Sequence, residues 1–584
     1  MGRANGAPAS APRRANGRDR SPAIAEHGII GDTRTAALVA TDGTVDSLCW
    51  PAFDGPSLFA RLLDGGGADG EGHAGYFAIA PERAHDGTDG EPDDGDARRQ
   101  QIYLPDTNVL ITRFLSGHCV VEVTDFMPVD GPQRLVRLVA CLRGQARIAV
   151  RCAPRFDYAR ADHAARAVTA NGLGGAVEGV AFEATGGASL RLLASVPQRI
   201  EGGDATASFD LGKGERAAFM LDAPERVDAH DMADDPVAHA LHLFEKTVRY
   251  WRGWVGRSHY RGRSREIVLR SAFALKLMTS GEHGSIVAAP TFGLPETLGG
   301  ARNWYYRYAW IRDAAFTAYA LVKLGFTDEI TAFLRWAEAR LRENGDGSLQ
   351  IMYGLDGRRT LSEERLDHFG GYAGSTPVRI GNAAYSQLQL DSYGALMDAV
   401  YLAVKYAEPI SYDAWLAVTR TVDWVCEHWR REDEGIWEFR GGRRHFLSSR
   451  LMCWVAVDRA LRMAQKYSLP GPVARWQDAR NAIHHSVFAD FWNGERGAFV
   501  QSKGSTALDA ACLLMPLVKF ISPTDPRWLS TLDAVGRELA DDALVRRYDA
   551  EGEPRHRRAG GRRGHLHHLL VLVRRMPRAG GASG

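Results

Sequence analysis

The chain has 584 residues, of which 45% are hydrophobic and 24% are charged, and its formal net charge is +1. Length and composition indicate a globular protein of about two to four domains. Because no stretch approaches the roughly 18–20 uninterrupted apolar residues of a membrane span, the sequence excludes an integral membrane protein and predicts no membrane partner. Residues 1–24 are rich in Ala, Gly, Pro and Arg, lack an apolar signal-peptide core, and are predicted to form a disordered arm.

The seven cysteines are odd in number, scattered along the chain and never spaced as CxxC. This pattern argues against a disulfide framework and against a zinc site, and it favours a reducing compartment. We therefore expect a cytoplasmic protein without a structural metal.

Residues 25–258 have the pattern of a β-sandwich. Short apolar or alternating runs such as AALVAT, YFAIAP, NVLITRFL and ARIAVRCAP are separated by turns such as TDG at 41–43 and FDGP at 53–56. Many short strands at this spacing are typical of two packed sheets.

Residues 259–552 are predicted to form a second, all-helical domain. From about residue 262, apolar residues recur at i, i+3, i+4 and i+7, the period of an amphipathic helix. The helices that we expect are at 265–278, 311–325, 328–342, 389–407, 413–429, 449–467 and 473–488, with weaker ones at 507–518 and 526–540. Long loops rich in Trp, Tyr, Gly and His join them, and long loops in a compact domain are often functional.

Three loop segments contain candidate catalytic or sugar-binding residues. The first is NWYYRYAWIRDAAF at 303–316. Tyr and Trp rings stack on sugar rings, and their polar tips reach hydroxyl groups. Arg312 and Asp313 add a donor fork and an acceptor for neighbouring hydroxyls. The alternative is a simple charge pair at the start of a helix.

The other two segments are at 371–394 and 433–454. In the former, a Gly/Ser/Pro loop places Arg379, which we expect to bind substrate, and Asn382 just before a helix. The alternative for this segment is a capped helix entry. In the latter, Glu438 follows Trp437 in a loop flanked by glycines. A carboxyl packed against an indole has a raised pKa and can act as a general acid near neutral pH, whereas a solvated surface charge is the ordinary alternative.

These three segments resemble glycoside hydrolase family 15, the group of glucoamylases, glucodextranases and bacterial trehalases. Three N-terminal segments share the resemblance: GIIGDTRTAALVATDGTVDSLCWPAFDGPSLFARLL at 28–63, PDTNVLITRFL at 105–115 and DFMPV at 125–129. The resemblance covers roughly residues 25–550. It implies an N-terminal β-sandwich followed by an (α/α)6 barrel, and it implies hydrolysis with inversion at the anomeric carbon. In such enzymes an acid and a base carboxyl group are typically ~6.5–9.5 Å apart.

The resemblance also assigns roles to individual residues. Glu438, in GIWE, corresponds to the general acid. The residues that correspond to the binding site for the terminal glucose are Arg312, Asp313, Trp310, Trp437 and Tyr306, and Arg547 corresponds to an arginine that contacts the next sugar. No metal or organic cofactor is implied, although some trehalases of the group are helped by phosphate or magnesium.

Two positions depart from the family pattern. Tyr305 stands where the NWDYRY run has an acid, and we expect it to change the packing of the loop at the sugar site. Ser47 stands where a Trp usually follows Asp46, in the sandwich domain.

The resemblance ends in residues 553–584. The family's general base lies near the end of the barrel in a motif like AEQYD or AEEYD, and no such motif follows Tyr548. Instead, residues 554–584 contain eight Arg, four His and no acid, whereas the remaining chain has 64 basic against 71 acidic side chains. One interpretation is a tail that binds nucleic acid, because Arg clusters bind phosphates. The sequence favours a shifted reading frame instead. GC-rich codons for residues 561–575 can be chosen so that the next frame encodes GEGTFTTCSFWYVE, which resembles the family's usual continuation.

The sequence ranks an inverting, exo-acting glucoamylase first, with an α-glucan or a maltooligosaccharide as substrate. The alternatives are an α,α-trehalase acting on trehalose, or a relic without activity because the base region is missing. Nucleic acid is not an expected partner, and the oligomeric state is left open. Should the base lie elsewhere, Glu363 and Glu364 in LSEERLDHFGGY are the alternatives.

If residues 553–584 are out of frame, the barrel lacks its closing helices and its base. We therefore predict that the 584-residue chain is poorly soluble and inactive, and that the chain with the frame restored after about residue 553 is monodisperse and releases glucose. Soluble yield and glucose release from maltose and trehalose, measured for both versions, check this. Equal solubility and turnover of the two would refute the shifted frame, as would genomic sequence with no such alternative frame.

Overall fold

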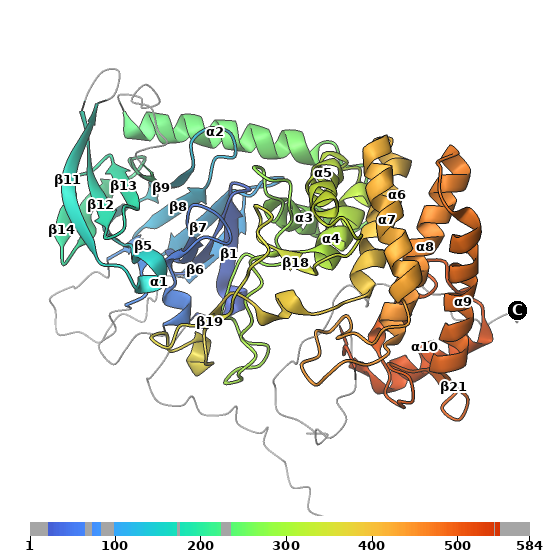
Figure 1. Ribbon diagram of the computed structural model, residues 1–584. Coiled ribbons are helices and arrows are strands. Elements are labelled where there is room, and N and C mark those ends of the chain that lie inside the picture. Colours follow the sequence, from blue (N-terminus) through green and yellow to red (C-terminus); the bar gives the residue numbers. More distant parts are fainter. Residues whose placement is uncertain are drawn as a thin grey trace, which may run out of the picture.

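The computed structural model describes residues 22–548 apart from 65–72, 83–97, 172–175, 224–234 and 542–543. A β-sandwich comes first along the chain and a helical domain follows it, as Figure 1 shows. The predicted tail at 553–584, and all but the last three residues of the predicted arm at 1–24, lie outside the described residues.

The sandwich consists of two antiparallel sheets with eight strands each. The first sheet has the order β1-β2-β3-β5-β10-β15-β14, with β4 beside β3: β1 His27–Gly31, β2 Ala36–Ala40, β3 Thr44–Cys49, β4 Ser57–Phe59, β5 Tyr76–Pro81, β10 Gln145–Ala153, β15 Asp204–Gly212 and β14 Arg199–Glu201. The second has the order β11-β12-β13-β16-β9-β8-β7-β6: β11 His163–Asn171, β12 Ala176–Ala184, β13 Ser189–Ala194, β16 Arg216–Asp222, β9 Arg134–Arg143, β8 Val120–Phe126, β7 Leu110–Leu115 and β6 Arg98–Tyr103.

Alternating burial along the strands produces the core between the sheets. Every second residue of β7 is buried, and β10 begins with the same alternation. Successive side chains of a strand point to opposite faces, so this period of two gives one apolar face. Phe77 and Ile148 of the first sheet join Val123 and Phe219 of the second in one apolar cluster.

Each of the seven strongly periodic segments between 265 and 488 forms a helix. The helices are α3 Arg265–Leu277, α4 Ile311–Leu324, α5 Asp328–Glu343, α6 Asp391–Tyr406, α7 Tyr412–His428, α8 Leu447–Tyr467 and α9 Val473–Phe491. Of the two weaker segments, 526–540 forms α10 Pro526–Glu538, and 507–518 forms only the short 3-10 helix η7 Ala510–Leu514. In the described part of the chain no helix is both long and apolar enough to cross a membrane.

The helices form an inner and an outer layer. α4, α6 and α8 contact one another in turn, and α5, α7 and α9 pack outside them. α8 is buried around most of its circumference, whereas α5 buries one face only. A helix that is covered on all sides belongs to the interior, and a helix with one apolar stripe covers it.

Helix α2 (Pro236–Val255) was not predicted, because it lies inside the range read as β-rich. Asp235 caps it, accepting a hydrogen bond from the Val237 N–H at 2.8 Å, and Pro236 occupies its first turn. Its buried residues include Ala240, Leu243, Thr247, Trp251 and Trp254, a helical spacing that the sequence does contain. α2 packs on β9 and β16 and runs along the sandwich toward the helical domain (Figure 1).

Arg307 ties the sandwich to the loop that precedes α4. Its guanidinium is fully buried and donates to the carbonyls of Phe53 and Gly55, both at 2.6 Å, and to the Tyr158 hydroxyl at 2.8 Å. The Tyr305 ring lies 4.5 Å from it. The residue that departs from the family pattern therefore packs as an aromatic face against a buried cation, where cation–π attraction is strong.

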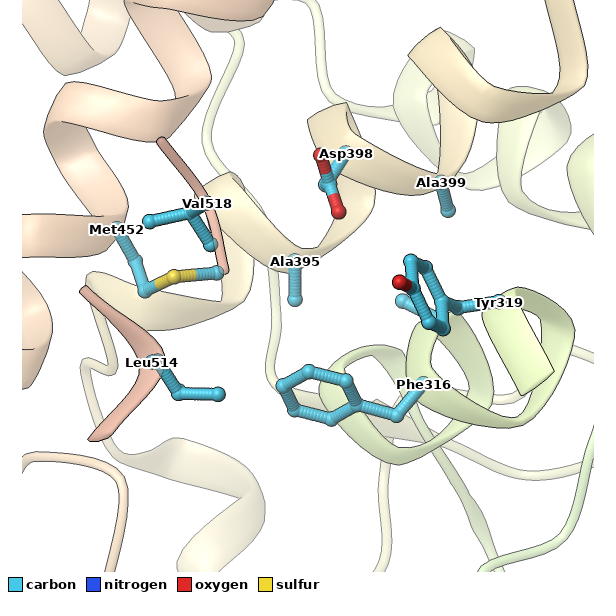
Figure 2. A pocket seen from close by; sticks show the side chains of 9 residues that line it. Phe316, Tyr319, Ala395, Asp398, Ala399, Met452, Leu514 and Val518 are labelled. Atoms are coloured by element: carbon cyan, nitrogen blue, oxygen red, sulfur yellow. The ribbon is translucent and has the colours of Figure 1, made fainter. Parts of the chain in front are cut away.

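A small apolar pocket lies between the inner helices, lined by Phe316 and Tyr319 of α4, Ala395 of α6, Met452 of α8, and Leu514 (Figure 2). None of the predicted site residues lines it. Phe316 and Tyr319 are 38% and 40% exposed. If the closing helices of the barrel are missing, aromatic rings on an inner helix should be exposed in this way. The gap in the barrel stays a prediction, because residues 549–584 lie outside the described part of the chain.

Candidate active site

The proposed acid, Glu438, lies in a tight loop between α7 and α8. Its φ is 57°, a left-handed conformation that is uncommon for residues other than glycine and costs of order 1 kcal/mol. The turn depends on Gly435, whose carbonyl accepts a hydrogen bond from the Glu438 N–H at 3.1 Å. A Cβ on Gly435 would lie 2.7 Å from the Phe446 ring. The loop thus fixes the backbone that presents the Glu438 side chain.

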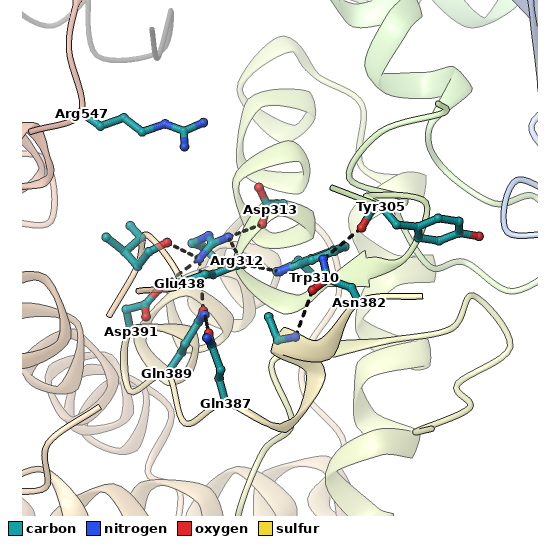
Figure 3. A network of polar contacts seen from close by, with 12 residues as sticks. Tyr305, Trp310, Arg312, Asp313, Asn382, Gln387, Gln389, Asp391, Glu438 and Arg547 are labelled. Carbon is teal, nitrogen blue, oxygen red and sulfur yellow. Dashed lines mark hydrogen bonds and ion pairs between the residues drawn. The ribbon is translucent and has the colours of Figure 1, made fainter. Parts of the chain in front are cut away.

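The start of α4 holds the Glu438 carboxyl group through Oε1. The Trp310 Nε1–H donates to this oxygen at 2.6 Å, and Arg312 Nη2 donates to it at 3.4 Å (Figure 3). Among the described residues, every hydrogen bond to the carboxyl group falls on Oε1. Since Oε1 accepts these bonds, Oε2 is the oxygen that can carry a proton toward a substrate.

Arg312 is the centre of the polar network in Figure 3. Its guanidinium donates to the Ile436 carbonyl at 2.8 Å, to Gln389 Oε1 at 3.2 Å and to Asp313 Oδ2 at 3.0 Å. The side chain is largely buried, and neighbouring carboxylates raise its pKa despite that burial. The predicted Arg312–Asp313 pair therefore exists, and it is joined to Glu438.

Glu438 combines burial with a nearby cation. Burial raises the pKa of its carboxyl group, Arg312 and the Trp310 hydrogen bond lower it, and the net effect is a raised pKa. A protonated carboxyl at neutral pH is what a general acid requires. The sequence predicts Trp437 as the desolvating indole, whereas the indole that bonds to the carboxyl is Trp310. Trp310 is 1% exposed and offers no open stacking face for a sugar.

Two further buried carboxyl groups lie behind Arg312. Asp391, at the start of α6, is 3.9 Å from Arg312 Nη1, and neither of its oxygens accepts a hydrogen bond from another described residue. Asp433 accepts from the Leu390 N–H at 2.9 Å and the Ser449 hydroxyl at 2.6 Å. Burial raises the pKa of Asp391 to about 6 and that of Asp433 to about 7.

Trp437 and Tyr306 are the aromatic residues next to Glu438 and Trp310, respectively. The Trp437 Nε1–H donates to Asp509, and the Arg547 guanidinium lies 5.4 Å from the Trp437 ring. The half-buried Tyr306 ring is 5.5 Å from Trp310, and burial followed by the charge of Glu438 raises its pKa. Figure 3 shows Arg547 apart from the Arg312 network, and its ion-pair partner is Glu296, at 3.7 Å.

Arg379 is not brought into the Arg312 network. Its side chain pairs with Glu363 at 3.2 Å, donates to the Ala301 carbonyl at 2.9 Å and stacks on Trp304. Glu363 also pairs with Arg440, and Glu364 pairs with Arg160 of the sandwich. These ion pairs occupy both carboxylates that the sequence names as alternative bases. Asn382 caps a 3-10 helix (Ala383–Ser386) and donates to the Tyr305 carbonyl at 3.1 Å.

Sequence reasoning missed Gln389, Asp391, Asp433 and Asp509. Asp509 had a detectable signal, because an aspartate directly before a helical run is a typical N-cap. Asp391 stands at the start of a predicted helix, but its position beside Arg312 depends on how α4 and α6 pack, which no local pattern reveals.

Comparison with known proteins identifies the family. The profile of glycosyl hydrolases family 15 matches residues 262–582, and that of the trehalase-like N-terminal domain matches residues 13–186. The chain belongs to glycosyl hydrolases family 15. It is thus a glycoside hydrolase by family. The match reaches into the tail at 553–584, whose reading frame stays a prediction.

Relatives match over most of the chain. The trehalase of Mycolicibacterium smegmatis is 34% identical and that of Mycobacterium tuberculosis 33%, each over 91% of this chain and over 80% and 78% of the relative. A bacterial glucoamylase solved with acarbose superposes with a TM-score of 0.67 at 13% identity, covering 93% of this chain and 83% of that one. This likeness shows the fold. The predicted β-sandwich followed by an (α/α)6 barrel is confirmed.

The buried carboxyl groups predict how stability depends on pH. The pKa of Asp433 is about 7 in the folded protein, well above its ordinary value, so the folded state binds this proton more tightly than the unfolded state. Protonated Asp433 therefore stabilises the fold at low pH, and this stabilisation is lost as pH rises through 7. We expect Asp433→Asn to remove this pH dependence of stability, because asparagine mimics the protonated aspartate. The unfolding free energy of the wild type relative to the variant should fall by about 1–3 kcal/mol between pH 5 and pH 8 in urea titrations.

Asp525→Asn is the matched control, because the partly exposed Asp525 has a lowered pKa and is ionised throughout this range. A pH-independent difference between the wild type and Asp433→Asn would contradict the assignment of Asp433.

Proposed function

We propose that the site is that of an inverting α,α-trehalase, with Glu438 as the general acid. The observation that carries the chemistry is the Glu438 carboxyl group, buried, bonded through one oxygen by Trp310 and Arg312, and shifted toward its protonated form. The choice of substrate rests on relatives named trehalase, which are 33–34% identical over 91% of the chain.

Glu438 donates its proton from Oε2 to the oxygen between the two glucose units. Arg312 keeps Oε1 oriented, and its positive charge stabilises the carboxylate that forms when the proton leaves. Asp313 and Arg312 provide an acceptor and a donor for hydroxyl groups of the terminal glucose, and the Tyr306 hydroxyl lies toward the reacting carbon. Water then attacks from the opposite face, which inverts that carbon.

The family's general base lies beyond the position of Tyr548, where this sequence lacks the AEQYD-like motif, so no residue of the 584-residue chain is assigned as the base. The proposal accordingly assigns the acid and the sugar-binding residues: Arg312, Asp313, Tyr306, Trp437 and Arg547. Hydrolysis of maltooligosaccharides, which the sequence ranks first, gains nothing from the glucoamylase structure at 13% identity, because such a likeness is evidence of fold alone.

We predict that Glu438→Gln lowers kcat for trehalose by at least ~10²-fold in the chain with its frame restored. The amide is nearly isosteric but has no acidic proton, so sugar binding should persist. Glu408→Gln is the control, since this exposed carboxylate pairs with Arg335 and should be replaceable without loss. Retention of more than about a tenth of kcat by Glu438→Gln would reassign the acid.

We also predict that trehalose is the preferred substrate of the chain with its frame restored. An inverting enzyme should release one β-glucose and one α-glucose from each trehalose, because only the attacked carbon changes configuration. Proton NMR of fresh reaction mixtures, with trehalose and maltose compared at equal concentrations, measures both preference and stereochemistry. Faster release of glucose from maltose would favour the glucoamylase alternative.

A further inference from the structure

Asp509 is a buried carboxylate whose hydrogen bonds reach the wall of the proposed sugar site. It lies directly before η7, and its side chain is 5% exposed. The Trp437 Nε1–H donates to both of its oxygens, at 2.9 and 3.1 Å. Gln501 Nε2 donates to Oδ2 at 3.0 Å, and the Ala511 N–H donates to Oδ1 at 2.7 Å.

The partner of this carboxylate adjoins the acid. Trp437 precedes Glu438 in the chain, and Glu438 is held in a left-handed conformation, so a rotation of Trp437 would be transmitted to the acid. The Trp437 ring also lies beside Arg547 and, at 6.4 Å, beside Tyr548. The indole thus links the acid loop to the segment that follows α10.

We propose that Asp509 is a positioning residue for the proposed function: it fixes the Trp437 indole as one wall of the sugar site. A hydrogen bond to a buried carboxylate is stronger than one between neutral groups, and a bond shared by both oxygens restricts the orientation of the indole. Asp509 acts through Trp437, not by contact with the sugar.

The competing explanation is that Asp509 only caps η7. Asp509→Asn separates the two roles, because asparagine is a good N-cap whose Oδ1 can still accept from the Ala511 N–H. Its Nδ2 would then face the two N–H donors, Trp437 and Gln501, that Oδ2 serves. The cap is kept, whereas Trp437 loses the shorter bond, to Oδ2, and keeps only the 3.1 Å bond to Oδ1, which it shares with the Ala511 N–H.

The test is a double-mutant cycle in the chain with its frame restored after about residue 553, with the wild type, Asp509→Asn, Trp437→Phe and the double variant. Binding of labelled glucose is measured by equilibrium dialysis, and thermal unfolding is measured in parallel. We expect Asp509→Asn to weaken glucose binding about tenfold in the wild-type background, equivalent to the loss of one hydrogen bond to a charged group. In the Trp437→Phe background it should change binding by less than about twofold.

Asp525→Asn is the matched control, since Asp525 caps α10 by accepting from the Arg527 N–H at 2.9 Å, away from the site. It should leave glucose binding unchanged. Equal glucose affinity of Asp509→Asn and wild type, or the same loss in both backgrounds, would overturn the proposal. Failure of the frame-restored wild type to bind glucose would instead refute the proposed function, and this role of Asp509 with it.

Discussion

The organisation of the site depends on a buried guanidinium. A charge removed from water is costly unless ionic and hydrogen-bonding partners replace the solvent. The partners of Arg312 come from three places: its own helix supplies Asp313, the residues leading into α6 supply Gln389 and Asp391, and the acid loop supplies Ile436 and Glu438. Because the hydrogen-bond and ionic partners of Arg312 come from three chain segments, these segments lie side by side, and the site is formed where they meet.

The same constraint tunes the acid. Arg312 alone would lower the pKa of Glu438, but the burial that Arg312 shares raises it, and burial prevails. Behind them, Asp391 and Asp433 have raised pKa values for the same reason. Burial thus shifts the carboxyl groups of this site toward their protonated form, which is the form that acid catalysis uses.

The β-sandwich contributes to the site without providing a catalytic group. Arg307 extends from the loop before α4 into the sandwich, where two carbonyls and the Tyr158 hydroxyl accept its hydrogen bonds. The aromatic rings of Tyr305 and Phe292 pack around it. The loop that contains Tyr306 and Trp310 is therefore anchored on one side by the sandwich and on the other by Glu438.

The architecture and the loop of the proposed acid could be predicted from the sequence. Period-two and period-3.6 patterns located the strands and the helices from α3 to α9, because burial of one face leaves a regular trace in a chain. Motifs located Glu438, Arg312 and Asp313 through family resemblance. Helix α2 escaped detection although its apolar spacing is present, because the surrounding strands dominated that stretch of sequence.

Which side chains contact one another could not be predicted and depends on tertiary packing. Trp310 is a buried hydrogen-bond donor to Glu438 and does not present a ring face for stacking on a sugar. Arg379 contacts Glu363 and Trp304. Asp509 binds Trp437, which is 72 residues away in the chain. The physical reason is that burial patterns record whether a residue faces the interior, but not which residue from a distant helix it will face. Partners of that kind are fixed by how α4, α6, α8 and their loops pack together.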